Sequence, residues 1–471
     1  MLETLVKRKQ IELDLKLKSL ENELSAWCER ANQDGPLEKH HSQLLVLQAH
    51  LNGWHTTIRA KLDHYKTLKA DAYLSCCANA ETLILSEHRI WEYFRSKLIQ
   101  RNEKWFIDYL RAADEFAWSC YWPVQKTVYP NGHDAQRKEP PLVFFNGGLS
   151  PFSVSRGKSF QPETVAGEVL NLDRAASVTK LPVPVVGVPW DQVNHLPAVL
   201  VIGHETGHIV EDDFGLRPDL TSLLESALAD ADAKSRADAW HSWLGETFAD
   251  LYGCLAGGPA FAGALIDFLI KGQEQIGQEE QTAPEWGDYP TACLRVKFVL
   301  KVLEEMNFAP DLTEYEKYWE GFSSRMPEEY LSDIRHVARW LLKGKQKALG
   351  NKSIQDIFTF SEKQQEQVVE TCETLSKIGP DTQVEPPSRD IRVLFAAARL
   401  AYEKDPAAYV ENDYSAVVLD HITYKVVEKG VRAGRAKPPQ SRLTALEKAG
   451  AEWANSLMDA FPEPVVEAPG D

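Results

Sequence analysis

The sequence predicts a mainly α-helical protein with one small β element. Apolar residues recur at intervals of three and four over long stretches on both sides of the centre, which is the period of an amphipathic helix. The segment 123–200 is instead rich in proline, glycine and β-branched residues, and it holds short apolar runs typical of strands. A chain of 471 residues is long enough for about two or three domains. We therefore divide it into 1–122, 123–310 and 311–471.

The first segment, residues 1–122, is predicted to be a helical, coiled-coil-like domain. Two apolar seams alternate spacings of four and three, as in a heptad repeat. A turn at 32–36 separates them, so the two helices should form an antiparallel hairpin. A third helix is expected to carry further aromatic residues. In chain order the three sets are Leu13, Leu17, Leu20, Leu24 and Trp27; Leu44, Leu47, Leu51, Trp54 and Ile58; and Trp91, Phe94, Leu98, Trp105 and Tyr109.

This N-terminal domain has two interpretations. It can be a helical bundle that packs against the rest of the protein. Alternatively, it can be an arm through which the chain forms a homo-oligomer or docks a regulatory protein.

The central region contains two strand candidates, Leu142–Phe145 and Val183–Val188. If the second strand had an exposed edge, it could hold an extended peptide by adding it to the sheet. An ordinary core strand is the competing interpretation. The segment 311–471 is again helical in pattern, and its tail, residues 462–471, is expected to be disordered.

Composition excludes several classes of protein. With 52 basic and 69 acidic residues the formal net charge is −17, which argues against a nucleic-acid partner. The 7 cysteines are scattered, as is typical of reduced thiols in a cytoplasmic protein. The most apolar stretch, 251–270, is interrupted by Gly257, Gly258 and Pro259. We expect it to be a core segment and no membrane span to be present.

The motif His204-Glu205-x-x-His208 is the strongest chemical signal in the chain. On a helix the two histidines lie one turn apart on the same face, so their imidazoles can converge on one metal ion. Glu205 adjoins the first ligand, where its carboxylate can reach a metal-bound water. Gly203 and Gly207 are poor helix formers and indicate that something packs closely against this helix.

A catalytic zinc site takes three protein ligands, so a third must come from elsewhere. Asp212 follows on the same helix, but three ligands in a row along one straight helix diverge from a single ion. Glu246 lies 38 residues after His208 and can approach from a second helix. Asp250, one turn after Glu246, could hold the outer nitrogen of a ligating imidazole.

With Glu246-x-x-x-Asp250 following it, the motif resembles the gluzincins, the thermolysin-like group of zinc metallopeptidases. The resemblance covers the central third of the chain and implies a zincin-like catalytic domain at 123–310. It also implies one Zn²⁺ ion bound by His204, His208 and Glu246, with Glu205 as the general base. Asp250 would orient a ligand, although Asp250 itself as the third ligand stays open as an alternative.

The expected reaction is the hydrolysis of a peptide bond in a protein or peptide substrate. Glu205 would take a proton from the zinc-bound water and pass it to the leaving amine. The developing oxyanion needs a further hydrogen-bond donor, and the candidates are Tyr289, His241 and Arg295, with Tyr289 the first choice. Two alternatives remain. One is an inactive adaptor with the metallopeptidase fold, acting through its helical arm; the other is a zinc hydrolase of non-peptide amides or esters.

Overall fold

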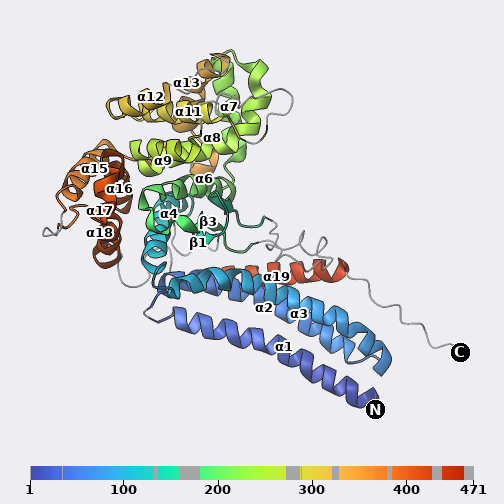
Figure 1. The fold of residues 1–471 in the computed structure, drawn as a ribbon. Coiled ribbons are helices and arrows are strands. Elements are labelled where there is room, and N and C mark those ends of the chain that lie inside the picture. Colours follow the sequence, from blue (N-terminus) through green and yellow to red (C-terminus); the bar gives the residue numbers. More distant parts are fainter. Residues whose placement is uncertain are drawn as a thin grey trace.

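The computed structural model describes residues 2–33, 35–130, 136–158, 181–271, 287, 289–320, 328–378, 384–426 and 437–460. These residues form a mainly α-helical protein with a three-stranded sheet, so the predicted fold class is confirmed (Figure 1). The expected disorder of residues 462–471 lies outside the described residues.

The N-terminal helices form an elongated arm that extends away from the rest of the protein (Figure 1). The helices are α1 (Leu2–Ala31), α2 (His41–Tyr65) and α3 (Ala70–Leu98). Every residue of the two predicted seams is buried, and α1 ends just before the expected turn. The hairpin of α1 and α2 is therefore confirmed.

The prediction of one helix through Trp91, Trp105 and Tyr109 is wrong. The chain leaves α-helical geometry after Leu98, and a new helix, α4 (Ile107–Val128), begins beyond it. Trp105 lies between the two helices and is 81% exposed. The break lies where the buried Arg101 donates hydrogen bonds to Asp114 and to the carbonyl of Val143. Apolar spacing carries no information about such a tertiary contact.

The last described helix, α19 (Gln440–Ala460), packs along α2 and is part of the arm (Figure 1). The two backbones approach closely at glycines. A Cβ atom at Gly53 would lie 1.9 Å from the carbonyl oxygen of Glu447, and one at Gly450 would lie 1.9 Å from that of His50. Both ends of the described chain therefore meet in one small core.

The sheet separates this arm core from the main core. Its strands are β1 (Leu142–Asn146), β2 (Phe152–Val154) and β3 (Val185–Pro189), in the order β1-β3-β2. β1 pairs with β3 in parallel, and β2 pairs with it antiparallel. Side chains alternate between the faces, so Val143 and Val186 enter the main core while Phe144 and Val185 enter the arm core. β3 is central and buried, so the core-strand interpretation of Val183–Val188 is correct and the edge interpretation is wrong.

The remaining helices pack around the main core together with α4. The predicted three-part division stays a prediction, but the described helices on either side of residue 311 share this one core. These helices are α6 (Val201–Asp213), α7 (Arg217–Asp230), α8 (Ala237–Gly257), α9 (Pro259–Leu269), α11 (Ala292–Glu305), α12 (Thr313–Glu320), α13 (Glu328–Lys343), α14 (Ile354–Ile357), α15 (Glu362–Leu375), α16 (Ile391–Lys404), α17 (Pro406–Glu411) and α18 (Tyr414–His421).

Residues 251–266 of the apolar stretch are buried in the core, as expected, whereas Phe268 and Ile270 at its end are exposed. The stretch turns between α8 and α9 at Gly258, whose φ of 58° suits a residue without a side chain. Among the described helices, none combines the length and the apolar character that a membrane crossing requires. All seven cysteines are buried, and none of them forms a disulfide bond.

Candidate metal centre

The helix that carries the motif, α6, packs closely against α8. A Cβ atom at Gly203 would lie 2.7 Å from that of Ala256, and one at Gly207 would lie 2.8 Å from that of Tyr252. The two glycines therefore let the helices approach, as their presence in the sequence indicated. This contact brings the histidines of α6 next to the carboxylates of α8.

His204, His208 and Glu246 come together as a group that can hold a metal ion. Their potential ligand atoms all lie within 4.8 Å of one another. His204 Nε2 is 3.4 Å from Glu246 Oε2, and His208 Nε2 is 3.2 Å from Glu246 Oε1. Ligands bound to one tetrahedral zinc at about 2.0–2.1 Å are separated by about 3.3 Å. The two imidazole–carboxylate distances are close to that separation, each to a different oxygen of Glu246.

The polar atoms of this group also fit a metal ion. His204 and Glu246 are each only 8% exposed. Oε2 of Glu246 is buried and accepts no hydrogen bond of good geometry from a described residue; its nearest polar neighbours are His204 Nε2 at 3.4 Å and Arg295 Nη2 at 3.5 Å. A buried carboxylate oxygen without a donor is costly, and a bound cation would satisfy it.

Asp250 lies behind His204, on the side away from Glu246. Its Oδ1 is 2.9 Å from His204 Nδ1, so the other ring nitrogen, Nε2, faces Glu246. Arg295 of α11 donates hydrogen bonds to Asp250 from Nε and Nη2, at 2.8 and 2.7 Å. Because Asp250 is engaged by both neighbours, it is placed to orient the imidazole. The metal-binding group contains Glu246 and not Asp250.

The charges of this cluster shift the pKa values of its members. Burial alone would lower the pKa of His204, but the carboxylates of Asp250 and Glu246 raise it to about 10. Burial opposes ionisation of Glu246, yet its pKa is lowered because both imidazoles contact it. Burial likewise opposes ionisation of Asp250, and Arg295 lowers its pKa. Both carboxylates are therefore kept ionised, as metal ligands and their partners must be.

Glu205 opens onto the same cavity as the three potential ligands but is not part of the metal-binding group. The cavity has a volume of about 820 Å³ and is walled by β2, α6, α9 and the start of α11. Tyr289 lies on its wall and is 64% exposed. Arg295 reaches the cavity too, but its guanidinium is committed to Asp250. The structure does not place His241 on the wall of this cavity.

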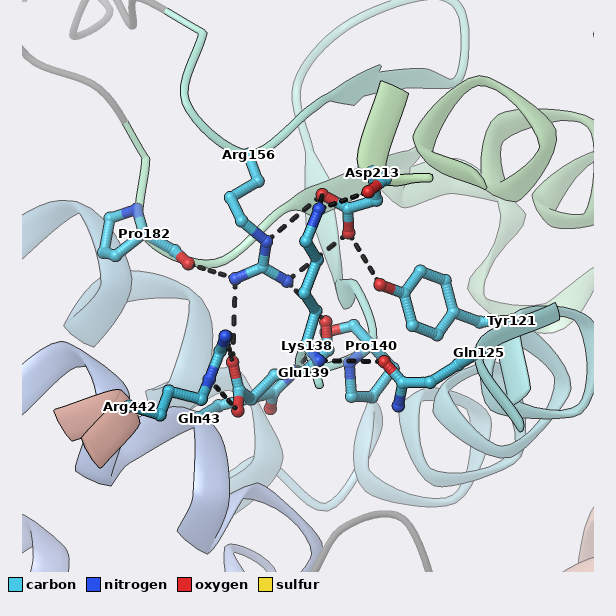
Figure 2. Close-up of polar contacts among 10 residues, drawn as sticks. All are labelled: Gln43, Tyr121, Gln125, Lys138, Glu139, Pro140, Arg156, Pro182, Asp213 and Arg442. Atoms are coloured by element: carbon cyan, nitrogen blue, oxygen red, sulfur yellow. Dashed lines mark hydrogen bonds and ion pairs between the residues drawn. The ribbon is translucent and has the colours of Figure 1, made fainter. Parts of the chain in front are cut away.

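The far end of α6 is fixed by a buried polar cluster (Figure 2). Asp213, the last residue of α6, accepts hydrogen bonds from Tyr121 at 2.7 Å and from Arg156 at 3.2 Å. Arg156 also donates to the carbonyl of Glu139, and the carboxylate of Glu139 accepts from Arg442 of α19. Sequence reasoning did not find this cluster, since its members come from five separate segments and form no local pattern.

No protein-family model, curated protein or solved structure matches this chain. The resemblance to the gluzincins therefore rests on the motif around His204 and on Glu246 and Asp250 alone, and it stays a hypothesis. What the described residues support is coarser: a mainly helical protein in which two histidines and a glutamate can hold a metal ion.

Proposed function

We propose that this protein is a zinc-dependent metallopeptidase with a zincin-like catalytic centre. One observation carries the proposal: His204, His208 and Glu246 lie close enough together to hold one metal ion, and Glu205 opens onto the same cavity. A fourth ligand position facing a cavity is typical of catalytic zinc and not of structural zinc.

The chain's own residues have distinct tasks in this reaction. Zinc, when bound, lowers the pKa of a coordinated water and polarises a carbonyl oxygen. Glu205 accepts a proton from the attacking water and delivers it to the leaving nitrogen. Asp250 keeps the imidazole of His204 in the tautomer and orientation that a ligand needs. Tyr289, on the wall, is the candidate donor to the oxygen that becomes negative.

The shape of the cavity favours a peptide as substrate. One wall is β2, which pairs with β3 through one edge and with no other strand among the described residues. An extended peptide can add to such an edge through main-chain hydrogen bonds. The adjacent wall from α9 is apolar, with Phe261 and Leu265 lining it. A peptide side chain would be desolvated there.

The substitution Glu205→Gln tests the proposal because it removes the base and preserves the shape of the side chain. The variant should bind zinc like the wild type and lose cleavage of a peptide library by at least about 100-fold. Glu225→Gln, at an exposed site on α7, is the matched control and should cleave normally. Unchanged cleavage by the Glu205 variant would exclude the assignment, and a wild type that cleaves no peptide would favour the adaptor.

A further inference from the structure

The two ends of the metal cavity differ in chemistry. At one end α9 contributes apolar side chains, including Phe268, which is 42% exposed although it is aromatic. At the other end lie charged residues: Glu211 and Asp212 from α6, Lys158 and Arg217. Lys158 is paired with Asp212 at 2.6 Å. The guanidinium of Arg217 is the planar group at this end with two adjacent donors that can face one ligand.

Arg217 is held in position by a buried carboxylate. Its Nε lies 2.5 Å from Oε1 of Glu211, whose side chain is only 3% exposed, whereas the side chain of Arg217 is 52% exposed. Neither Nη atom donates a hydrogen bond to any residue that the structure describes. The Nε edge of the guanidinium therefore faces Glu211 as an ion pair without a hydrogen bond, since Oε1 of Glu211 has no hydrogen-bond partner among the described residues. The two Nη atoms remain for a ligand.

The guanidinium also lies beside α8, at the residue that precedes the potential metal ligand Glu246, and both Arg217 and Glu246 line the cavity. It rests on Gly245, where a Cβ atom would be 3.0 Å from Nη2 and 3.9 Å from Cζ. A side chain at this position would have to displace the guanidinium by a few tenths of an ångström. Arg217 is moreover the first residue of α7, where a positive charge opposes the helix dipole. Local helix stability therefore does not account for an arginine at this position.

We propose that Arg217 is a specificity-determining residue that binds a carboxylate of the substrate. A planar guanidinium with two adjacent N–H donors can donate two parallel hydrogen bonds to the two oxygens of one carboxylate. The cleavage of such a substrate rests on the proposed function, whereas the binding of its carboxylate by Arg217 does not depend on it. The carboxylate is either the C-terminus of a peptide, which would make the enzyme a carboxypeptidase, or an acidic side chain near the bond that is cleaved.

Binding to the zinc-loaded Glu205→Gln protein tests this without turnover. The probes are N-acetylated tetrapeptides of leucine and alanine ending in a carboxylate or an amide, and amidated tetrapeptides with glutamate or glutamine at the third position. A carboxylate should tighten binding, measured by calorimetry, by about 10- to 100-fold. The pair that shows the difference identifies the source of the carboxylate.

In the same background, Arg217→Gln should abolish that preference, and Arg217→Lys should keep part of it as a point charge. Arg95→Gln, at an ion-paired arginine of the arm, is the matched control and should keep the whole preference. Equal binding of acid and amide peptides, failure of all peptides to bind, or a preference that survives in Arg217→Gln would each overturn the proposal. If Arg217→Gln does not fold, Arg217→Lys provides the test. An unchanged preference for carboxylate peptides in Arg217→Lys would show that the guanidinium does not recognise the carboxylate. A parent enzyme that cleaves nothing would refute the peptidase and leave this binding result standing.

Discussion

Asp250 shows how one buried carboxylate can control a metal ligand. Its Oδ1 contacts Nδ1 of His204, and its carboxylate accepts two hydrogen bonds from the guanidinium of Arg295. Its negative charge makes the imidazole a better electron donor and fixes the direction of Nε2. The position is therefore expected to set the affinity for the ion while making no bond to it.

The substitution Asp250→Asn should weaken zinc binding by about 10- to 100-fold, as partners of ligating histidines typically do. Competition with a chromogenic chelator measures the affinity, on protein whose folding has been verified by its thermal transition. Asp238→Asn, at an exposed position on the same helix, should leave the affinity unchanged. An unaltered affinity in the Asp250 variant would show that the contact with His204 is incidental.

At the scale of single residues, the sequence predicted those site residues that belong to a short motif with helical spacing. His204, Glu205 and His208 follow from helical spacing, and Glu246 with Asp250 follow from the same rule on a second helix. Arg295 was one of three candidate donors to the oxyanion; it lines the cavity, and its bond to Asp250, 45 positions earlier in the chain, was not predicted. The pairing depends on how α8 and α11 pack, and that packing leaves no mark in local spacing.

At the scale of elements, the contact between α6 and α8 depends on glycine. Gly207→Ala would place a Cβ atom 2.8 Å from that of Tyr252 and 3.2 Å from the Cα of Ala249. The helices must separate, which costs about 1–3 kcal/mol, while the gain in helix propensity is only about 1 kcal/mol. We expect a net loss of stability in urea unfolding together with weaker zinc binding.

Gly147→Ala is the control for that substitution, because nothing lies within 4 Å of its added Cβ atom. It should change the free energy of unfolding by no more than about 0.5 kcal/mol. A Gly207 variant as stable as this control would mean that the two helices are not in the close contact described.

Helices whose buried residues recur at a regular spacing were predicted from the sequence. Elements without such a regular spacing were missed. The seams of α1 and α2 are continuous, so spacing alone identifies the hairpin. β2 has three residues and is defined by pairing with β3, a partner more than thirty positions away. Likewise, the break before α4 depends on Arg101 and Asp114, which meet only in the folded chain.

At the scale of the whole molecule, two cores are joined by the sheet and by buried ion pairs, among them Arg101 with Asp114 and Arg442 with Glu139. Arg101, between α3 and α4, donates three hydrogen bonds to Asp114 and one to the carbonyl of Val143 in β1. The packing of α19 on α2 adds the C-terminal part of the chain to the arm. Gly53 and Gly450 lie at the closest approach of the two helices, but neither glycine identifies the other as its partner in the sequence.

The ion pair between Arg101 and Asp114 predicts how the free energy of unfolding depends on pH. Burial would raise the pKa of Asp114, but Arg101 lowers it to about 2, below its ordinary value of 3.8. The folded state therefore binds the proton less readily than the unfolded state. The stabilisation, about 2 kcal/mol, is fully present above pH 4 and is lost as the pH falls towards 2. In Asp114→Asn the free energy of unfolding should be lower at neutral pH and should fall less over this range. Equal acid dependence of variant and wild type would contradict the assignment.

The most direct test of the metal centre is anomalous diffraction at the zinc absorption edge from crystals of the zinc-loaded protein. We predict one zinc ion per chain, bonded to Nε2 of His204, Nε2 of His208 and a carboxylate oxygen of Glu246 at about 2.0–2.2 Å, with its fourth position open to the cavity. A protein that binds no zinc, or binds it through other residues, would contradict the proposal.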